Sequence, residues 1–305
     1  MNLFLETLKV LVLSTYYLLE SLVRCVIPRR KKNVTGEIVL ITGSGSGIGR
    51  LMALKFARLG AVLVLWDIDP EGNKETGRLA KEAGAVRVHT YTCDCSKREE
   101  VYKVADQVKK EVGDVNILIN NAGIVSGKKF IESLDSRMQK TMEVNAMAHF
   151  WTYKAFLPAM VASNCGHLVS IASAAGLFGT NELADYCASK FAAVGFAETI
   201  DVEMHALKKT GIKTTIVCPY FINTGMFDGV TTRFPRLLPI LDPEYAAETI
   251  VNAILREQVY LIIPALVCIL FAVKNLLPTK VIHLWEDYTG VSHSMDHFRG
   301  WVKKD

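Results

Sequence analysis

Tyr186 and Lys190 are the residues of this chain whose types and spacing most directly suggest chemistry. They lie four residues apart in a stretch that we expect to form a long helix through Asp201, so their side chains would share one face. An isolated tyrosine, with a pKa of about 10, is a poor base at neutral pH, and a neighbouring ammonium group lowers that pKa. The pair could therefore exchange a proton with a bound molecule. The same spacing also arises by chance in purely structural helices, so the pair needs support from its surroundings.

A glycine-rich segment, Thr42-Gly43-Ser44-Gly45-Ser46-Gly47-Ile48-Gly49, lies between an apolar stretch and a helical stretch, Arg50–Leu59. Glycines let the chain turn tightly and approach a pyrophosphate. The helix that follows would present free N–H groups and the positive end of its dipole. The segment therefore predicts a phosphate-binding loop.

Asp67 ends the next apolar stretch, 24 residues after Gly43, where a carboxylate can hydrogen-bond the diol of an adenosine ribose. A carboxylate at this place would repel a 2′-phosphate, and Gly43–Gly49 contains no Lys or Arg to neutralise one. We therefore predict NAD as the cofactor, in preference to NADP. The alternative is that Asp67 is only a solvated turn residue beside Asp69.

Short apolar stretches alternate with amphipathic helical stretches between Gly36 and Pro264, which is typical of a βαβα order. The expected strands are Ile38–Ile41, Val62–Trp66, Arg87–Thr92, Val115–Ile119, His167–Ile171, Ile212–Val217 and Gln258–Ile263. Right-handed crossovers make such strands parallel, and their nearly continuous apolar character indicates a sheet covered on both faces. We predict an α/β fold, a Rossmann-type doubly wound parallel sheet of about seven strands.

Further motifs accompany the loop and the Tyr–Lys pair: Asn120-Asn121-Ala122-Gly123, Asn145, Ser173 and Tyr186-Cys-Ala-Ser-Lys190. Taken together, over about Gly36–Pro264, they resemble the motifs of the short-chain dehydrogenases/reductases. The resemblance implies that Tyr186 is the general acid and base, and that Lys190 tunes it and grips the nicotinamide ribose. It also implies that Ser173 orients the substrate oxygen and that Asn145 holds a water of the proton relay.

The same resemblance implies a cofactor site. Asp94 would contact the adenine and Asn121 the cofactor sugar, while Thr224, in Pro219-Tyr-Phe-Ile-Asn-Thr, would contact the carboxamide. Tyr220 departs from the family, which usually has glycine after that proline. The residues expected to bind NAD are Gly43, Ser46, Gly47, Ile48, Gly49, Asp67, Asp94, Asn121, Tyr186, Lys190 and Thr224.

Three longer segments resemble the 16C family of these enzymes: Ala83-Gly-Ala-Val-Arg-Val-His-Thr-Tyr-Thr-Cys-Asp-Cys, Trp151-Thr-Tyr-Lys-Ala-Phe-Leu-Pro-Ala-Met and Gly211-Ile-Lys-Thr-Thr-Ile-Val-Cys-Pro. That family includes retinol dehydrogenases and relatives that act on hydroxysteroids, anchored to endoplasmic reticulum or lipid droplets. The resemblance implies oxidation of a lipophilic alcohol, with all-trans-retinol giving all-trans-retinal. A 17-beta-type hydroxysteroid dehydrogenase and a non-catalytic lipid-droplet scaffold are the alternatives; the intact catalytic set speaks against the scaffold.

Within the first 32 residues, Leu3–Ile27 is strongly apolar, with a narrow polar stripe made by Glu6, Lys9, Glu20 and Arg24. The uncharged run within it, Val10–Leu19, is too short to span a bilayer, so we expect a helix in a membrane interface. The basic cluster at residues 29–32 favours anionic lipid and the cytosolic side. The alternatives are a helix packed on its own domain and a cleaved signal peptide, which would carry its basic residues before the apolar run.

We divide the chain into an anchor (1–32), an NAD-binding catalytic domain (36–264) and an apolar helix with a tail (265–305). The apolar helix, Ala265–Leu277, either dips into the same membrane or closes the core. The segment Tyr220–Leu241 should cover the substrate. Its apolar residues are Phe221, Met226, Phe227, Phe234 and Leu237.

Composition sets the remaining limits. The chain has 305 residues, half of them apolar, and a net charge of +4, which is too mild for a dedicated nucleic-acid binder. Its seven cysteines lack zinc-type spacing, so we predict no metal site. The expected partners are a lipophilic alcohol or aldehyde, a retinoid first of all, and membrane lipid. Family resemblance also implies a homodimer, paired through the long helices after the fourth and fifth strands.

Overall fold

The computed structural model describes residues 3–300, apart from the side chains of residues 25 and 26. Seven strands form one sheet in the order β3-β2-β1-β4-β5-β6-β7, and every neighbouring pair is parallel. They are β1 (Ile38–Thr42), β2 (Val62–Asp67), β3 (Arg87–Thr92), β4 (Ile117–Asn120), β5 (Gly166–Ile171), β6 (Ile212–Pro219) and β7 (Tyr260–Ile263). The predicted doubly wound parallel sheet is confirmed.

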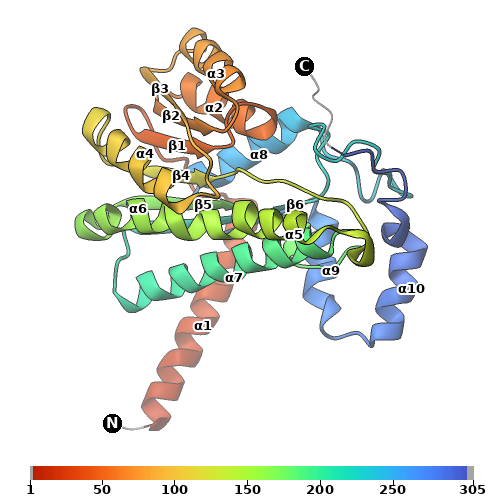
Figure 1. Cartoon of the computed structure of the whole chain (residues 1–305). Helices are drawn as coiled ribbons and strands as arrows, with labels where there is room; N and C mark the ends of the chain where they lie inside the picture. The colour runs from red at the N-terminus through yellow and green to blue at the C-terminus, as the bar shows by residue number, and fades with distance from the viewer. Residues whose placement is uncertain (1–2, 301–305) are drawn as a thin grey trace.

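Helices cover both faces of this sheet (Figure 1). Those on one face are α2 (Gly47–Arg58), α3 (Pro70–Glu82) and α8 (Pro243–Leu255), which share a core cluster with β1. Those on the other are α4 (Arg98–Glu111), α6 (Ala148–Ser163) and α7 (Ala184–Ala206), which pack around Trp66 and Phe156. Buried on both faces, the central strands are nearly continuous in apolar residues, as the sequence indicated.

The edge strand β3 departs from this apolar pattern. Its side chains are exposed or half-buried because only β2 pairs with it. An edge strand can carry polar residues such as the exposed Thr90 without burying them in the core.

The strand order reverses at β1, which has β2 on one side and β4 on the other. Such a reversal leaves a crevice at the carboxyl ends of the strands, and ligands of doubly wound sheets bind there. The glycine-rich loop follows β1, Asp67 ends β2, and Asn121 follows β4. The topology therefore brings these three predicted site segments to one crevice.

At the N-terminus, α1 (Leu3–Val26) stands away from the body of the molecule (Figure 1). Its large apolar side chains, including Leu11, Tyr17 and Leu22, are exposed. Within residues 3–300, no helix combines the length and the apolarity needed to cross a membrane.

The linker after α1 is attached to the body at Lys32. The backbone N–H of Lys32 donates to the Leu255 carbonyl at 2.8 Å, and its Nζ lies 3.1 Å from Nδ1 of the buried His167. The other ring nitrogen of His167 lies 2.8 Å from Thr215 Oγ1. Residues before Lys32 can therefore project, whereas Lys32 itself packs against the sheet.

At the other end, α9 (Ala265–Lys274) stops three residues before the expected Leu277, and a further helix, α10 (Thr279–Thr289), follows. Pro278 separates the two helices, because a proline disfavours helical backbone at the residue before it. The turn between α9 and α10 and the free end of α1 extend to the same side of the molecule, the lower side in Figure 1.

Candidate active site

A cavity of about 1090 Å³ is lined by residues at the carboxyl ends of the strands. A pocket for one small molecule usually has 300–1,000 Å³, so this cavity has room for a dinucleotide and part of a second ligand. The predicted site residues that line it are Gly43, Ser46, Gly47, Ile48, Gly49, Asp67, Asp94, Asn121, Ser173, Tyr186, Lys190 and Thr224. Asn145 is the one predicted site residue that does not line it.

The glycine-rich loop is held close to its neighbours. Asn121 Nδ2 donates to the carbonyl oxygens of Thr42 and Gly43, at 3.0 Å each. A Cβ atom on Gly45 would lie 2.9 Å from the Asp67 carboxylate, and Gly47 has a φ of +52°, which favours glycine. The close fit explains why the loop is made of glycines.

The loop leads into the first turn of α2, whose residues Gly47, Ile48 and Gly49 line the cavity. Ser46 caps the helix without a side-chain hydrogen bond, and the first turn carries no acidic residue. The turn therefore offers N–H groups and the positive end of a helix dipole to an anion. These features fit the pyrophosphate of a dinucleotide.

Asp67 faces the same loop. Its Oδ2 accepts from the Gly45 N–H at 2.7 Å and its Oδ1 from the Asp69 N–H at 2.8 Å. A carboxylate can accept about four hydrogen bonds, so it can still receive two ribose hydroxyls. Arg50, which directly follows the glycine-rich loop, is bound to the carbonyl of Gly45 and, through Nε at 3.0 Å, to Thr76 Oγ1, and it does not line the cavity.

Asp94 and Thr224 lie at two other points of the wall. Asp94 Oδ1 accepts from the Ser96 backbone and hydroxyl, at 3.0 and 2.6 Å, and Lys140 Nζ lies 3.2 Å from Oδ2. Although burial opposes it, these contacts hold the pKa of Asp94 below its usual value. Thr224 packs beside Gly47, where a Cβ atom would lie 3.5 Å from that of Thr224.

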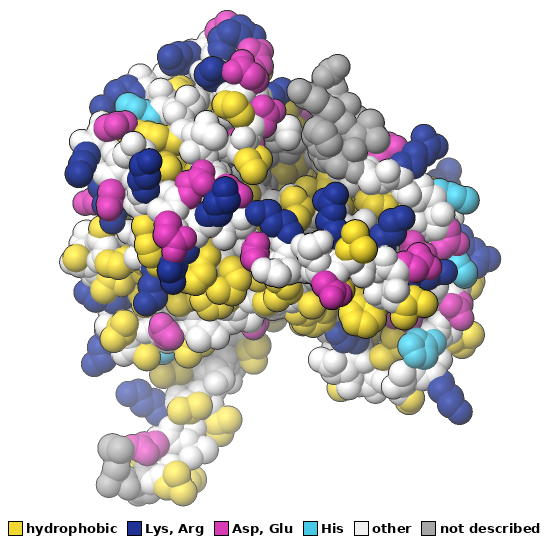
Figure 2. All heavy atoms as spheres, viewed as in Figure 1, with side chains coloured by type: hydrophobic (Ala, Val, Ile, Leu, Met, Phe, Trp, Pro, Cys, Tyr) yellow, Lys and Arg dark blue, Asp and Glu magenta, His cyan; other side chains and the backbone are white. Residues whose placement is uncertain are grey.

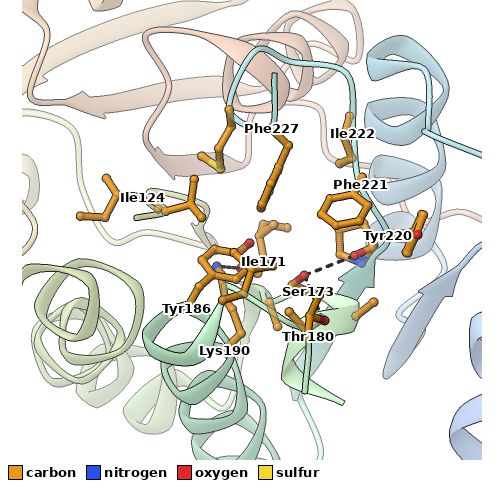
Figure 3. Close-up of a pocket in the computed structure, with 18 of the residues that line it drawn as sticks. Ile124, Ile171, Ser173, Thr180, Tyr186, Lys190, Tyr220, Phe221, Ile222 and Phe227 are labelled. Carbon is orange, nitrogen blue, oxygen red and sulfur yellow. Dashed lines mark hydrogen bonds between the residues drawn. The ribbon is translucent and has the colours of Figure 1, made fainter. Parts of the chain in front are cut away.

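Tyr186, Lys190 and Ser173 point into one part of the cavity, with Phe221 and Phe227 across from them (Figure 3). The Tyr186 ring meets Phe227 edge to face, with centroids 5.5 Å apart. Lys190 Nζ donates to the Ile171 carbonyl at 2.8 Å and lies 5.7 Å from the centre of the Tyr186 ring. The helix α7 thus places its phenol and ammonium on one face, as their spacing predicted.

Burial is the largest cause of the pKa shifts of Tyr186 and Lys190. It raises the pKa of Tyr186 well above 10, and a hydrogen bond with Ser173 only partly opposes it. Burial also lowers the pKa of Lys190 to about 8. The raised pKa of Tyr186 differs from the lowered one that the spacing of Tyr186 and Lys190 predicted, because removing the phenol from water disfavours its charged form.

Asn145 lies behind the cavity wall, fully buried in a π-helical turn, Glu143–Met147. Its Oδ1 accepts from the Ile124 N–H and its Nδ2 donates to the Ile124 carbonyl, both at 2.8 Å. Nδ2 also donates to Ser189 Oγ at 3.0 Å. The side chain therefore holds the wall segment after β4 against α7.

The outer wall of the cavity is apolar. Phe221, Met226 and Phe227 of the segment after β6 line it, as predicted. Phe234 instead packs on Tyr288 with ring centroids 5.3 Å apart, and Leu237 is exposed.

The part of this wall that α9 and α10 supply was not predicted from the sequence. Their lining residues are Leu266, Val267, Leu270, Val273, Lys274, Ile282, Trp285, Glu286 and Thr289. The sequence of α9 predicted only an apolar helix. The periodicity of so short an apolar run does not indicate whether it faces lipid, the core or a cavity. The tail also contributes: Met295 is buried in one cluster with Tyr186.

Comparison with known proteins identifies relatives over nearly the whole chain. Human epidermal retinol dehydrogenase 2 is 62% identical and covers 95% of this chain and 94% of its own. Bos taurus short-chain dehydrogenase/reductase family 16C member 6 is 57% identical over 98% and 94% of the two chains. Human estradiol 17-beta-dehydrogenase 11 is 48% identical over 92% and 93%.

A solved structure and a family match agree with these relatives. A short chain dehydrogenase/reductase from Burkholderia phymatum in complex with NAD is 29% identical, with a TM-score of 0.70 over 83% of this chain and 96% of that one. Residues 37–233 match the short chain dehydrogenase family. The chain therefore belongs to the short-chain dehydrogenase/reductase family of oxidoreductases, and to its 16C branch, as the motifs predicted.

Proposed function

We propose that this protein is a membrane-associated, NAD-dependent oxidoreductase that oxidises a lipophilic alcohol, all-trans-retinol, to its aldehyde. The observation that carries the proposal is the meeting of Tyr186, Lys190 and Ser173 with an apolar wall in one cavity. An alcohol with a long hydrocarbon body would bury that body against the wall and place its hydroxyl group at the phenol.

NAD held by the glycine-rich loop and Asp67 would supply the acceptor for the hydride that leaves the alcohol carbon. Tyr186 receives the hydroxyl proton, and Ser173, whose side chain lies beside the phenol, orients the alcohol oxygen. Because burial raises the pKa of Tyr186, the phenol needs positive charge nearby to lose its proton. Lys190 would supply part of that charge and hold the nicotinamide ribose, and a bound oxidised cofactor would supply further positive charge.

The protein side of the cofactor site favours NAD. Asp67 is positioned to accept the ribose hydroxyls and would repel a 2′-phosphate. Arg50 is engaged by carbonyl and hydroxyl oxygens, so no free cation from the loop would neutralise that phosphate. Asp94, Asn121 and Thr224 complete the contacts along the dinucleotide.

Membrane association rests on α1 and on the α9–α10 pair. The exposed apolar side chains of α1 exceed what a helix in water tolerates, and the basic residues that follow, including Arg29 and Arg30, suit anionic lipid. In the α9–α10 pair, Leu276 and Leu284 are also exposed. Figure 2 shows apolar side chains on the lower side of the view. We propose that the catalytic body faces the cytosol, on endoplasmic reticulum or lipid droplets.

A hydroxysteroid is the second candidate substrate, because a relative that is 48% identical is an estradiol 17-beta-dehydrogenase. A steroid alcohol would use the same Tyr186 and Ser173 and differ only in its fit to the wall. A homodimer, as in many members of the family, would leave this chemistry unchanged.

Purified full-length protein in detergent tests the proposal. It is given NAD or NADP with all-trans-retinol, estradiol or androstanediol, and the reduced cofactor is measured. We expect the highest kcat/KM with NAD and retinol. Higher kcat/KM for either steroid would assign the second candidate, and failure to oxidise any of the three would reject the proposal.

A further inference from the structure

Asp185, the residue before Tyr186, is a buried acid for which the reaction described above has no role. It lies in the first turn of α7 and is 8% exposed. Its Oδ1 accepts two hydrogen bonds of 2.8 Å, from the Tyr186 N–H and from Ser126 Oγ. Its Oδ2 is buried and has no hydrogen-bond partner within residues 3–300.

A buried carboxylate oxygen without a donor is costly to keep. The positive end of the α7 dipole offsets part of this cost. Capping alone would not need a charge, because a serine or asparagine at the N-cap position, now Leu183, could satisfy the same N–H group. Asp185 therefore serves something other than the helix end.

The partner of Asp185 points to that purpose. Ser126 belongs to the segment 121–126 after β4, and this segment lines the cavity. The hydrogen bond between Ser126 and Asp185 thus joins the cavity wall to the backbone N–H of Tyr186.

The same wall segment reaches Tyr186 by a second path. Asn145 binds both the N–H and the carbonyl of Ile124 and donates to Ser189 Oγ. Ser189 Oγ donates in turn to the Tyr186 carbonyl at 2.7 Å. The backbone N–H of Tyr186 is therefore linked to Ser126, and its backbone carbonyl is linked to Ile124. Both of these residues belong to the same wall segment after β4.

We propose that Asp185 and Ser126 are a positioning pair that holds the Tyr186 phenol at its place in the cavity. This inference rests on the proposed role of Tyr186 in proton transfer. Asp185 does not line the cavity, so it acts through Tyr186 and touches neither substrate nor cofactor. A displacement of the phenol by about 1 Å costs on the order of 100-fold in rate, while binding of NAD at the distant loop stays intact.

The test compares Asp185→Asn, Ser126→Ala and the double variant in the full-length protein. We expect each single variant to lower kcat about 10- to 100-fold and to leave the KM for NAD within about twofold. The double variant should be no slower than the slower single one, because both changes break the same link. Ser126→Thr, which keeps the hydroxyl, should retain most of kcat.

The control is another hydroxyl-to-carboxylate hydrogen bond that involves an aspartate of α7. Thr214 Oγ1 donates to Asp201 Oδ1 at 2.5 Å, and neither residue lines the cavity. Asp201→Asn should lower the thermal midpoint without changing kcat. If it lowers kcat as much as Asp185→Asn at equal loss of stability, the pair has only a structural role and the inference is overturned.

Hydrogen exchange separates this inference from the proposed function, because it needs no turnover. Ser126→Ala keeps the acid and its charge, so it should fold even if Asp185→Asn does not. It should speed exchange in a peptide covering residues 184–189 and leave a peptide from β1 unchanged. Unchanged exchange in 184–189, or single losses of kcat that multiply in the double variant, would overturn the positioning pair. Full activity of Tyr186→Phe would instead overturn the proposed function.

Discussion

Lys190 Nζ lies 5.7 Å from the centre of the Tyr186 ring, and its hydrogen bond goes to the carbonyl oxygen of Ile171, 2.8 Å away. The ammonium group is therefore placed beside the phenol by the end of β5. Both groups are buried, and burial favours the neutral form of each, so it raises one pKa and lowers the other.

The ionisation of Tyr186 should be visible in the ultraviolet absorbance of phenolate. Because its pKa is raised above 10, the free protein and Tyr186→Phe should titrate alike up to pH 10. With saturating NAD, the difference between the two should show one extra phenolate at lower pH, since nearby positive charge favours ionisation. An extra phenolate near pH 7 in the protein without NAD would contradict this order of effects.

Loss of the Lys190 charge should weaken both binding and chemistry. The pKa of Lys190 is about 8, so the ammonium form is present at neutral pH and is lost as the pH rises through about 8. At pH 7, Lys190→Met should lower kcat by a factor on the order of 100 and raise the KM for NAD. Lys154→Met, on α6 and away from the cavity, is the control. Wild-type kinetics in Lys190→Met would contradict the assignment.

Asp67 should set the choice between the two dinucleotides. Asp67→Asn removes the charge and should raise the KM for NAD about 10-fold, a loss of ~1.4 kcal/mol that is typical of hydrogen bonds to charged groups. It should lower the KM for NADP, since repulsion of the 2′-phosphate disappears. Glu71→Gln serves as control, because the Glu71 side chain, in the first turn of α3, is exposed. If the ratio of the KM for NAD to the KM for NADP stays constant, Asp67 does not bind the adenosine ribose.

Two truncations should separate anchoring from folding. Removal of residues 1–30 should release most of the protein from vesicles, with the α9–α10 pair retaining the rest, and leave its free energy of unfolding in urea unchanged. Removal of residues 1–32 also deletes Lys32, which leaves His167 Nδ1 without its partner. This longer truncation should lose an additional 1–3 kcal/mol, roughly the cost of an unsatisfied buried group. Equal stabilities would mean that Lys32 contributes nothing.

Much of the fold could be predicted because its signals are local. The strands are short apolar runs, and Gly45 and Asp67 belong to a motif read along the chain. Contacts between distant segments gave no such signal. Nothing in the sequence joins Ser126 to Asp185, and the apolar character of Leu270 does not say whether it faces lipid, core or cavity.

The pKa of the central pair could not be predicted for a related reason. Spacing puts Tyr186 and Lys190 on one helix face, but the depth at which α7 is buried decides which form of each group is favoured. The spacing indicated only that Lys190 would lower the pKa of Tyr186, whereas burial of the phenol raises it.

The most direct test of the account measures hydride transfer itself. Retinol carrying deuterium at its carbinol carbon is incubated with NAD and the purified full-length protein, and deuterium in the reduced cofactor is quantified. The wild-type protein should transfer deuterium, whereas Tyr186→Phe should transfer it at least about 100-fold more slowly and still bind NADH through the glycine-rich loop and Asp67. Equal transfer by the two proteins would contradict the claim that the Tyr186 phenol takes the proton.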